Sequence, residues 1–110
     1  MRITLPDADY KLRLISELAR TSIKLRDDFI RKNREKLRPL FGDYITSPGP
    51  IHRPAYHAVL LGFQEAWLRG NYQTILAVGE KLPTEFVEHY PEIRAFLGGA
   101  LNLAKLGKNS

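Results

Sequence analysis

The feature that most constrains this chain is a long stretch without helix breakers. No Gly or Pro occurs between Ala8 and Arg38, and Pro6-Asp7 stands directly before the stretch. Asp7 suits an N-cap, and a helix from Ala8 to Arg38 would be about 45 Å long. Because Pro39 disfavours the α conformation at Arg38, the helix is predicted to cover residues 8–38, with a break near Asn33 left open.

Apolar residues of this stretch fall on one side at helical spacing. At 100° per residue they cover nearly half of the circumference, so we expect this face to be buried against more than one neighbour. A helix bound to a membrane surface needs a free apolar face, and no membrane partner is therefore predicted. The face comprises Leu12, Leu14, Ile15, Leu18, Ala19, Ile23, Leu25, Phe29, Ile30 and Leu37.

The remaining sequence predicts a loop and further helices. Residues 42–53 concentrate Gly and Pro and predict a loop, and residues 54–107 predict a helical hairpin unit. In that unit a helix from Pro54 ends at Gly70, a second follows an Asn71 cap, and a short turn follows Thr84. A last helix runs from Pro91 to Gly107, with a frayed tail after it. Since strand signals are nearly absent, residues 1–110 are predicted to form a single all-α domain, a small helical bundle of four to five helices.

The positive charge of the chain is confined to its first forty residues. They hold eleven Lys or Arg and six Asp or Glu, and this excess equals the net charge of +5 of the whole chain. Residues 41–110 hold six of each kind and are neutral. A field confined to one part of a small protein indicates an acidic partner there.

Five cations of the predicted long helix form a row opposite its apolar face. They lie within about 40° of one another, with Arg34 near one margin and Asp27 interrupting the row. Such a row can follow a phosphate backbone without reading sequence. The alternative is a solvated face whose cations pair with Glu17, Asp27, Asp28 and Glu35 along the same helix. The row consists of Arg13, Arg20, Lys24, Arg31 and Arg38.

The Pro/Gly loop adds two candidates to the nucleic-acid-binding residues. Tyr44, expected to be exposed near Arg53, can stack on a base or anchor a protein contact. Alternatively, it pins the loop to the bundle. The predicted nucleic-acid-binding residues are therefore Arg13, Arg20, Lys24, Arg31, Arg34, Arg38, Tyr44 and Arg53.

The second half has a characteristic order of helix signals. One predicted helix ends at Gly70, Tyr72 follows, and a second predicted helix stops before Pro83. With Trp67, Leu68, Ile75 and Leu76, this segment resembles a piece of a tetratricopeptide repeat, over residues 55–106 in all. The sequence PTEFVEHYP departs from that pattern by adding a turn. The resemblance implies protein–protein binding and no catalysis.

Small and aromatic residues inside the predicted helices have two interpretations. The glycines indicate close helix–helix approach in the core or, alternatively, a shallow groove for a partner helix. The aromatic residues Tyr56, Phe63 and Trp67 are expected in the core more often than in a base-stacking platform. The glycines are Gly62, Gly79, Gly98 and Gly99.

Residues that would indicate catalysis are missing. The chain has no cysteine, and His52, His57 and His89 share no metal-ligand spacing. We therefore predict no enzyme, no metal and no cofactor, with an unrecognised site around His57 as the weakest alternative. The lack of cysteine and of an apolar leader predicts a cytoplasmic protein.

Taken together, the sequence predicts a non-enzymatic helical accessory subunit. Its basic N-terminal helix would contact a nucleic-acid backbone, and its neutral half would pack on a protein partner or a second copy. The alternative is a tetratricopeptide-like protein-interaction module whose charges only confer solubility.

Overall fold

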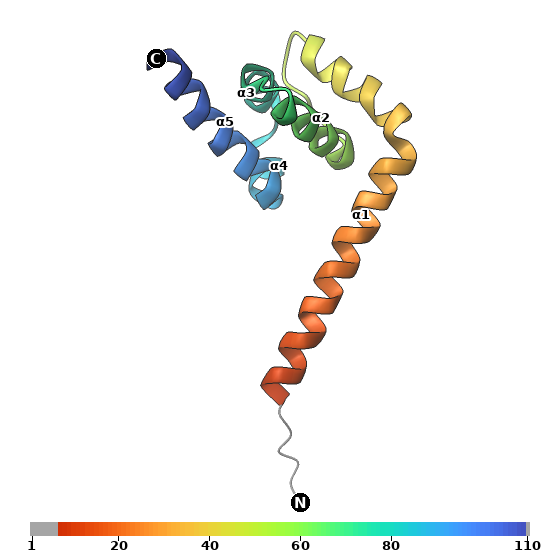
Figure 1. Ribbon diagram of the computed structural model, residues 1–110. Coiled ribbons are helices and arrows are strands. Elements are labelled where there is room, and N and C mark those ends of the chain that lie inside the picture. Colours follow the sequence, from red (N-terminus) through yellow and green to blue (C-terminus); the bar gives the residue numbers. More distant parts are fainter. Residues whose placement is uncertain (1–6, 110) are drawn as a thin grey trace, which may run out of the picture. The chain divides into compact units, whose positions relative to one another are not determined.

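Five helices make up the computed structural model, which describes the backbone of residues 7–109 and the side chains of residues 19–106. They are α1 (Asp7–Thr46), α2 (Tyr56–Leu68), α3 (Tyr72–Lys81), α4 (Thr84–His89) and α5 (Pro91–Asn109) (Figure 1). No strand occurs among residues 7–109, so the predicted all-α bundle is confirmed. The chain divides into two compact parts, residues 1–32 and 33–110, which are described separately; α1 contributes to both.

The end of α1 differs from the prediction. The helix continues through Pro39 to Thr46, so the predicted end at Arg38 is wrong. A proline removes one backbone hydrogen bond. Burial of Leu37 and Phe41, at 7% and 8% exposure and one turn apart, stabilises the same segment.

Polar contacts support the last turn of α1. The Thr46 hydroxyl donates to the carbonyl of Gly42 at 3.2 Å. Lys81 Nζ donates to the carbonyls of Tyr44 and Ile45, both at 2.9 Å. These bonds satisfy carbonyls that a helix end leaves without partners. The connection to α2 is therefore residues 47–55, shorter than the predicted 42–53 and displaced toward α2.

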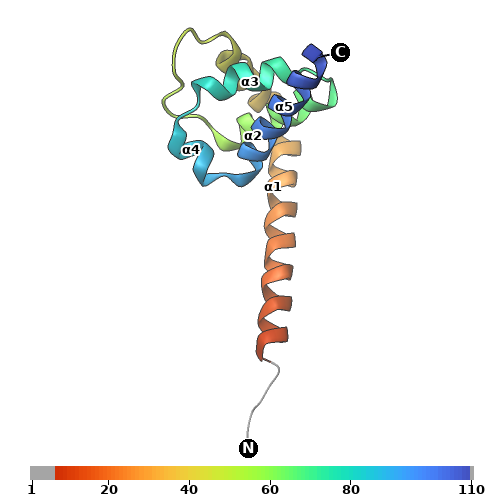
Figure 2. The ribbon, with the colours of Figure 1, turned by 90° about the vertical axis from the view of Figure 1, so that its left-hand side faces the viewer.

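The core of the second part lies where α2, α3 and α5 pack together (Figure 2). All three pairs of these helices contact one another, and α4 contacts α5. The aromatic residues predicted for the core contribute to it: Phe63 is fully buried, and Trp67 meets Phe96 and Tyr72 edge to face. The largest fully buried side chains are Phe63, Leu60, Ile75, Ile93, Val59 and Val78.

Glycines permit several of these helix contacts. The Phe41 ring lies where a Cβ at Gly62 would be, and Leu97 lies in the same way against Gly79. At Gly99, a Cβ would be 2.8 Å from Trp67 Cη2. Close helix approach in the core is thus confirmed for these three positions, whereas nothing lies within 4 Å of a Cβ at Gly98.

Helix ends after residue 53 follow the predicted punctuation with four differences. Helix α2 begins at Tyr56, with Ala55 as its N-cap, and not at the predicted Pro54. Gly70 has φ +75°, the left-handed conformation expected after α2. Asn71 precedes α3, but its ψ of 64° is not extended and its side chain makes no capping bond. Thr84 is the first residue of α4, with Pro83 before it. Helix α5 continues past Gly107 to Asn109, because a glycine costs a helix only about 1 kcal/mol.

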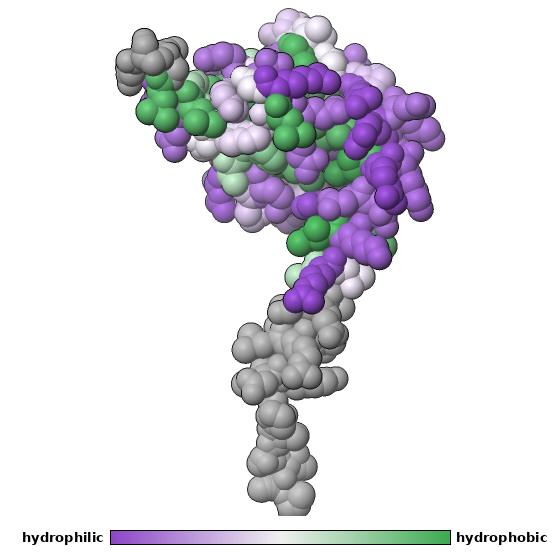
Figure 3. Space-filling model, in the orientation of Figure 1, coloured by the Kyte–Doolittle hydropathy of each residue, from purple (hydrophilic) through white to green (hydrophobic). Residues whose placement is uncertain are grey.

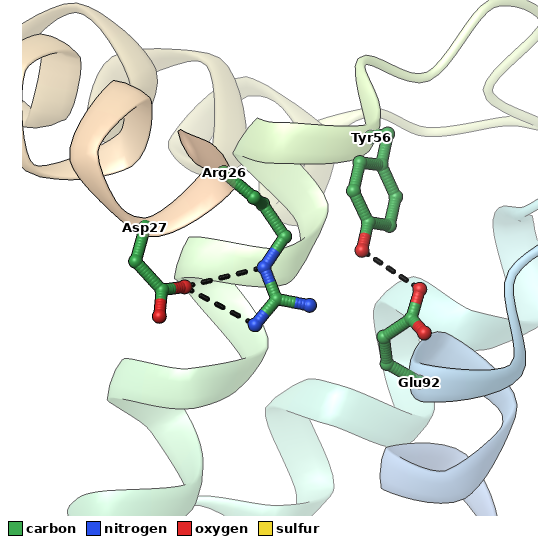
Figure 4. A network of polar contacts seen from close by, with 4 residues as sticks. All are labelled: Arg26, Asp27, Tyr56 and Glu92. Atoms are coloured by element: carbon green, nitrogen blue, oxygen red, sulfur yellow. Dashed lines mark hydrogen bonds and ion pairs between the residues drawn. The ribbon is translucent and has the colours of Figure 1, made fainter. Parts of the chain in front are cut away.

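Polar contacts between helices also hold the second part together. The Tyr56 hydroxyl on α2 donates to Glu92 Oε1 on α5 at 2.7 Å (Figure 4). The Tyr56 ring stacks on Tyr90, with ring centroids 4.1 Å apart. Both contacts join residues more than thirty positions apart in sequence, so they fix where α5 begins.

Candidate nucleic-acid interface

In the first part, two cations of the predicted row are exposed. Arg20 and Lys24 form no ion pair with a carboxylate among residues 19–106. Arg31 is partly neutralised, because its Nη2 lies 2.9 Å from Asp28 Oδ1. Arg13 lies outside the residues whose side chains the structure describes.

Asp27 pairs differently from the prediction. Its Oδ1 accepts hydrogen bonds from Nη2 and Nε of its neighbour Arg26, at 3.1 and 3.2 Å (Figure 4). The solvated-face interpretation had paired Asp27 with cations of the row. Asp27 therefore interrupts the row without neutralising Lys24 or Arg31.

The apolar side of α1 is only partly buried, which corrects the prediction. Ile30 and Leu37 are 5% and 7% exposed, but Ile23, Leu25 and Phe29 are 49%, 64% and 45% exposed. Ile23 lies on the same side of the helix as Ile30, seven residues away, so the difference in exposure depends on position along α1 and not on the width of the apolar face. The argument against a membrane-surface helix therefore does not hold for residues 23–29.

Membrane crossing is a separate question. Among the residues that the structure describes, none of the helices has both the length and the apolar character needed to cross a bilayer.

In the second part, Arg38 pairs with Glu65 of α2. Its Nε lies 3.1 Å from both carboxylate oxygens, and its Nη2 lies 2.5 Å from Oε2. These hydrogen bonds are the main reason that the pKa of Glu65 is lowered and that of Arg38 is raised. The charges of Arg69 and Arg34 also lower the pKa of Glu65, while its burial opposes the shift.

A hollow of about 200 Å³ lies beside this ion pair. Its polar side is formed by Arg38, Glu65 and Arg69, and its apolar side includes Phe41 and Leu61. Hydrophilic side chains gather over residues 33–46 of α1 in Figure 3. Sequence analysis missed Glu65 and Arg69, because a contact between two helices leaves no spacing signal within either helix.

Tyr44 pins the loop, which was the alternative interpretation. Its side chain is half-buried, and its hydroxyl accepts a hydrogen bond from the backbone N–H of Ala55 at 2.9 Å. The expected exposure of Tyr44 was therefore wrong. Arg53, on the loop that follows α1, is exposed.

Catalytic and metal-binding arrangements are not found in the described part of the chain. Within that part, no three His, Asp or Glu side chains converge as metal ligands. His57 lies against the Tyr56 ring, with centroids 5.2 Å apart. A non-enzymatic role thus stays a prediction.

Comparison with protein-family models, with curated proteins and with solved structures finds no match. The tetratricopeptide likeness therefore remains a resemblance of the residues quoted for it, and the function has to be argued from the side chains.

Proposed function

We propose that this chain is a non-enzymatic helical accessory subunit that contacts a nucleic-acid backbone through α1 and packs on a larger protein or nucleoprotein assembly. The observation that carries the proposal is the exposed pair Arg20 and Lys24. Within residues 19–106 neither has a carboxylate partner. They belong to the segment that holds the entire excess charge of +5.

The physical basis is counterion release. Each phosphate that a cation neutralises frees condensed counterions, so the binding constant falls as the salt concentration rises. On logarithmic scales the slope is about 0.9 per neutralised phosphate for duplex DNA and about 0.7 for single strands. Arg20 and Lys24 are four residues apart and thus on one face of α1. Contacts of this kind position a protein on the backbone and carry no sequence information.

The test is salt-dependent binding of the full chain to random-sequence duplex DNA and single-stranded RNA, measured by fluorescence anisotropy. The Arg20→Gln, Lys24→Gln double variant should bind more weakly, and its salt slope should be shallower by up to about 2. The matched control is Arg94→Gln, Lys105→Gln, which removes two exposed cations of α5. Equal losses in both double variants, or no binding by the unaltered chain at low salt, would refute the proposal.

The alternative is a tetratricopeptide-like protein-interaction module without nucleic-acid binding. It is supported by α5 packing on both α2 and α3, and by the exposure of large apolar side chains on α2 and α5. Leu68, Leu101 and Leu106 are 85%, 46% and 64% exposed. This module would bind a protein with an affinity that the Arg20→Gln, Lys24→Gln substitution leaves unchanged.

A further inference from the structure

Four charged residues of the second part form two pairs on facing helices. Arg34 and Arg38 are four residues apart on α1, and Glu65 and Arg69 are four residues apart on α2, so each pair lies on one face of its helix. Arg38 bonds Glu65 directly, and the charges of Arg34 and Arg69 act on the same carboxylate. Three guanidinium groups thus act on the Glu65 carboxylate, while Glu35 also acts on Arg38, so the group has a local excess of one positive charge.

The ion pair between Arg38 and Glu65 is accessible to solvent, and breaking it destabilises the fold only slightly. Their side chains are 50% and 22% exposed, and the hollow lies directly beside them. An ion pair with this exposure contributes little to the stability of a fold, because water and salt screen it. An outside anion of suitable shape can therefore replace the carboxylate without unfolding the helices.

The geometry of Arg38 suits a phosphate. It already presents Nε to Oε1 and Nη2 to Oε2 of the Glu65 carboxylate. The same planar fork binds two oxygens of a phosphate. Glu65 thus occupies the position that a phosphate oxygen pair would take.

We propose that Arg34, Arg38 and Arg69 form a phosphate-binding site, which Glu65 occupies as an internal anion until a nucleic-acid phosphate displaces it. That the phosphate belongs to a nucleic acid rests on the function proposed above. The site extends the interface beyond α1, because Arg69 is supplied by α2. It also gives Glu65 a role, since this carboxylate weakens binding by competing for Arg38.

Glu65→Gln is the decisive variant, because it removes the competing charge and keeps the size of the side chain. It should bind random-sequence DNA about three- to tenfold more tightly at low salt, with a salt slope steeper by about 0.9. The matched control is Glu80→Gln, which removes an exposed carboxylate from α3. A gain no larger than that of Glu80→Gln would overturn the proposal.

Arg69→Gln identifies the site as the origin of the gain. Added to Glu65→Gln, it should abolish most of the increase, whereas Arg94→Gln in the same background should not. Circular dichroism of each variant checks the fold, and Glu65→Ala is a second variant should the Gln variant unfold. Equal effects of Arg69→Gln and Arg94→Gln would show that only net charge matters, and the site would be rejected.

Inorganic phosphate separates this site from the proposed function. In the Glu65→Gln variant, the Nε–H resonance of Arg38 should shift on titration with phosphate and not with chloride of equal ionic strength. A phosphate shift without DNA or RNA binding would refute the nucleic-acid function and identify a site for a small phosphate ligand. If DNA or RNA binds but neither Glu65→Gln nor phosphate has an effect, the site is refuted and the function stands.

Discussion

Two segments of α1 share one amphipathic pattern and differ in their surroundings. In residues 19–29, Ile23 and Leu25 are 49% and 64% exposed; in residues 33–46, Leu37 and Phe41 are 7% and 8% exposed. The polar contacts differ as well. Asp27 and Asp28 pair with Arg26 and Arg31 within the same helix, whereas Arg38 reaches Glu65 of another helix. The pattern therefore shows which side of a helix is apolar, while the neighbouring helices decide whether it is covered.

A pair of identical substitutions gives the strongest test of this difference. Leu37→Ala removes a buried side chain and should lower the free energy of unfolding by about 2–5 kcal/mol, because it leaves a cavity. Leu25→Ala removes an exposed side chain and should change it by about 0.5 kcal/mol or less. Urea denaturation of the full chain measures both. Equal losses would show that Leu25 is as well packed as Leu37.

Two glycine substitutions should act in opposite directions. Gly62→Ala places a methyl group against the Phe41 ring and should destabilise the second part by about 1–3 kcal/mol. Gly98→Ala meets nothing within 4 Å and should stabilise α5 by up to about 1 kcal/mol. Thermal unfolding followed by circular dichroism reports both signs. A stabilising Gly62→Ala would contradict the close approach of α1 and α2.

Polar contacts can be compared in the same way. Tyr56→Phe removes the hydroxyl that joins α2 to Glu92 of α5 and should cost about 0.5–1.5 kcal/mol. Asp27→Asn alters a contact between neighbours on α1 and should cost less than about 0.5 kcal/mol. Denaturation midpoints under one set of conditions decide the order. The reverse order would mean that contacts within α1 matter more than contacts between helices.

The smallest expected effect is the pH dependence contributed by Glu65. Its pKa lies below the ordinary value of 4.5, so the ionised group stabilises the fold above that value. This contribution is lost as the pH falls through the lower, folded pKa. The stability advantage of the unaltered chain over Glu65→Gln is small at neutral pH, because the ion pair is exposed, and it should vanish in acid. A constant difference between pH 6 and pH 3 would contradict the ion pair.

Much of the fold could be predicted from local signals. Gly70, Pro83 and Pro91 mark the ends of α2, α3 and α4 to within a few residues, because these residues limit the backbone directly. The end of α1 could not be predicted in this way. The packing of Leu37 and Phe41 on both sides of Pro39 outweighed the local cost of the proline.

The candidate interface was predictable only along a single helix. Helical spacing placed Arg31, Arg34 and Arg38 on α1. Glu65 and Arg69 became evident only with the arrangement of α1 and α2, since neighbours across two helices are chosen by packing and not by spacing. The half-burial of Tyr44 had the same origin, because its partner Ala55 lies at the far end of the loop, directly before α2.

The ring of Phe41 occupies the space above Gly62, so the two positions share one volume. A larger residue at 62 is tolerated only with a smaller one at 41, and Phe41→Leu should partly rescue Gly62→Ala. Among homologous chains, these positions should consequently covary in size.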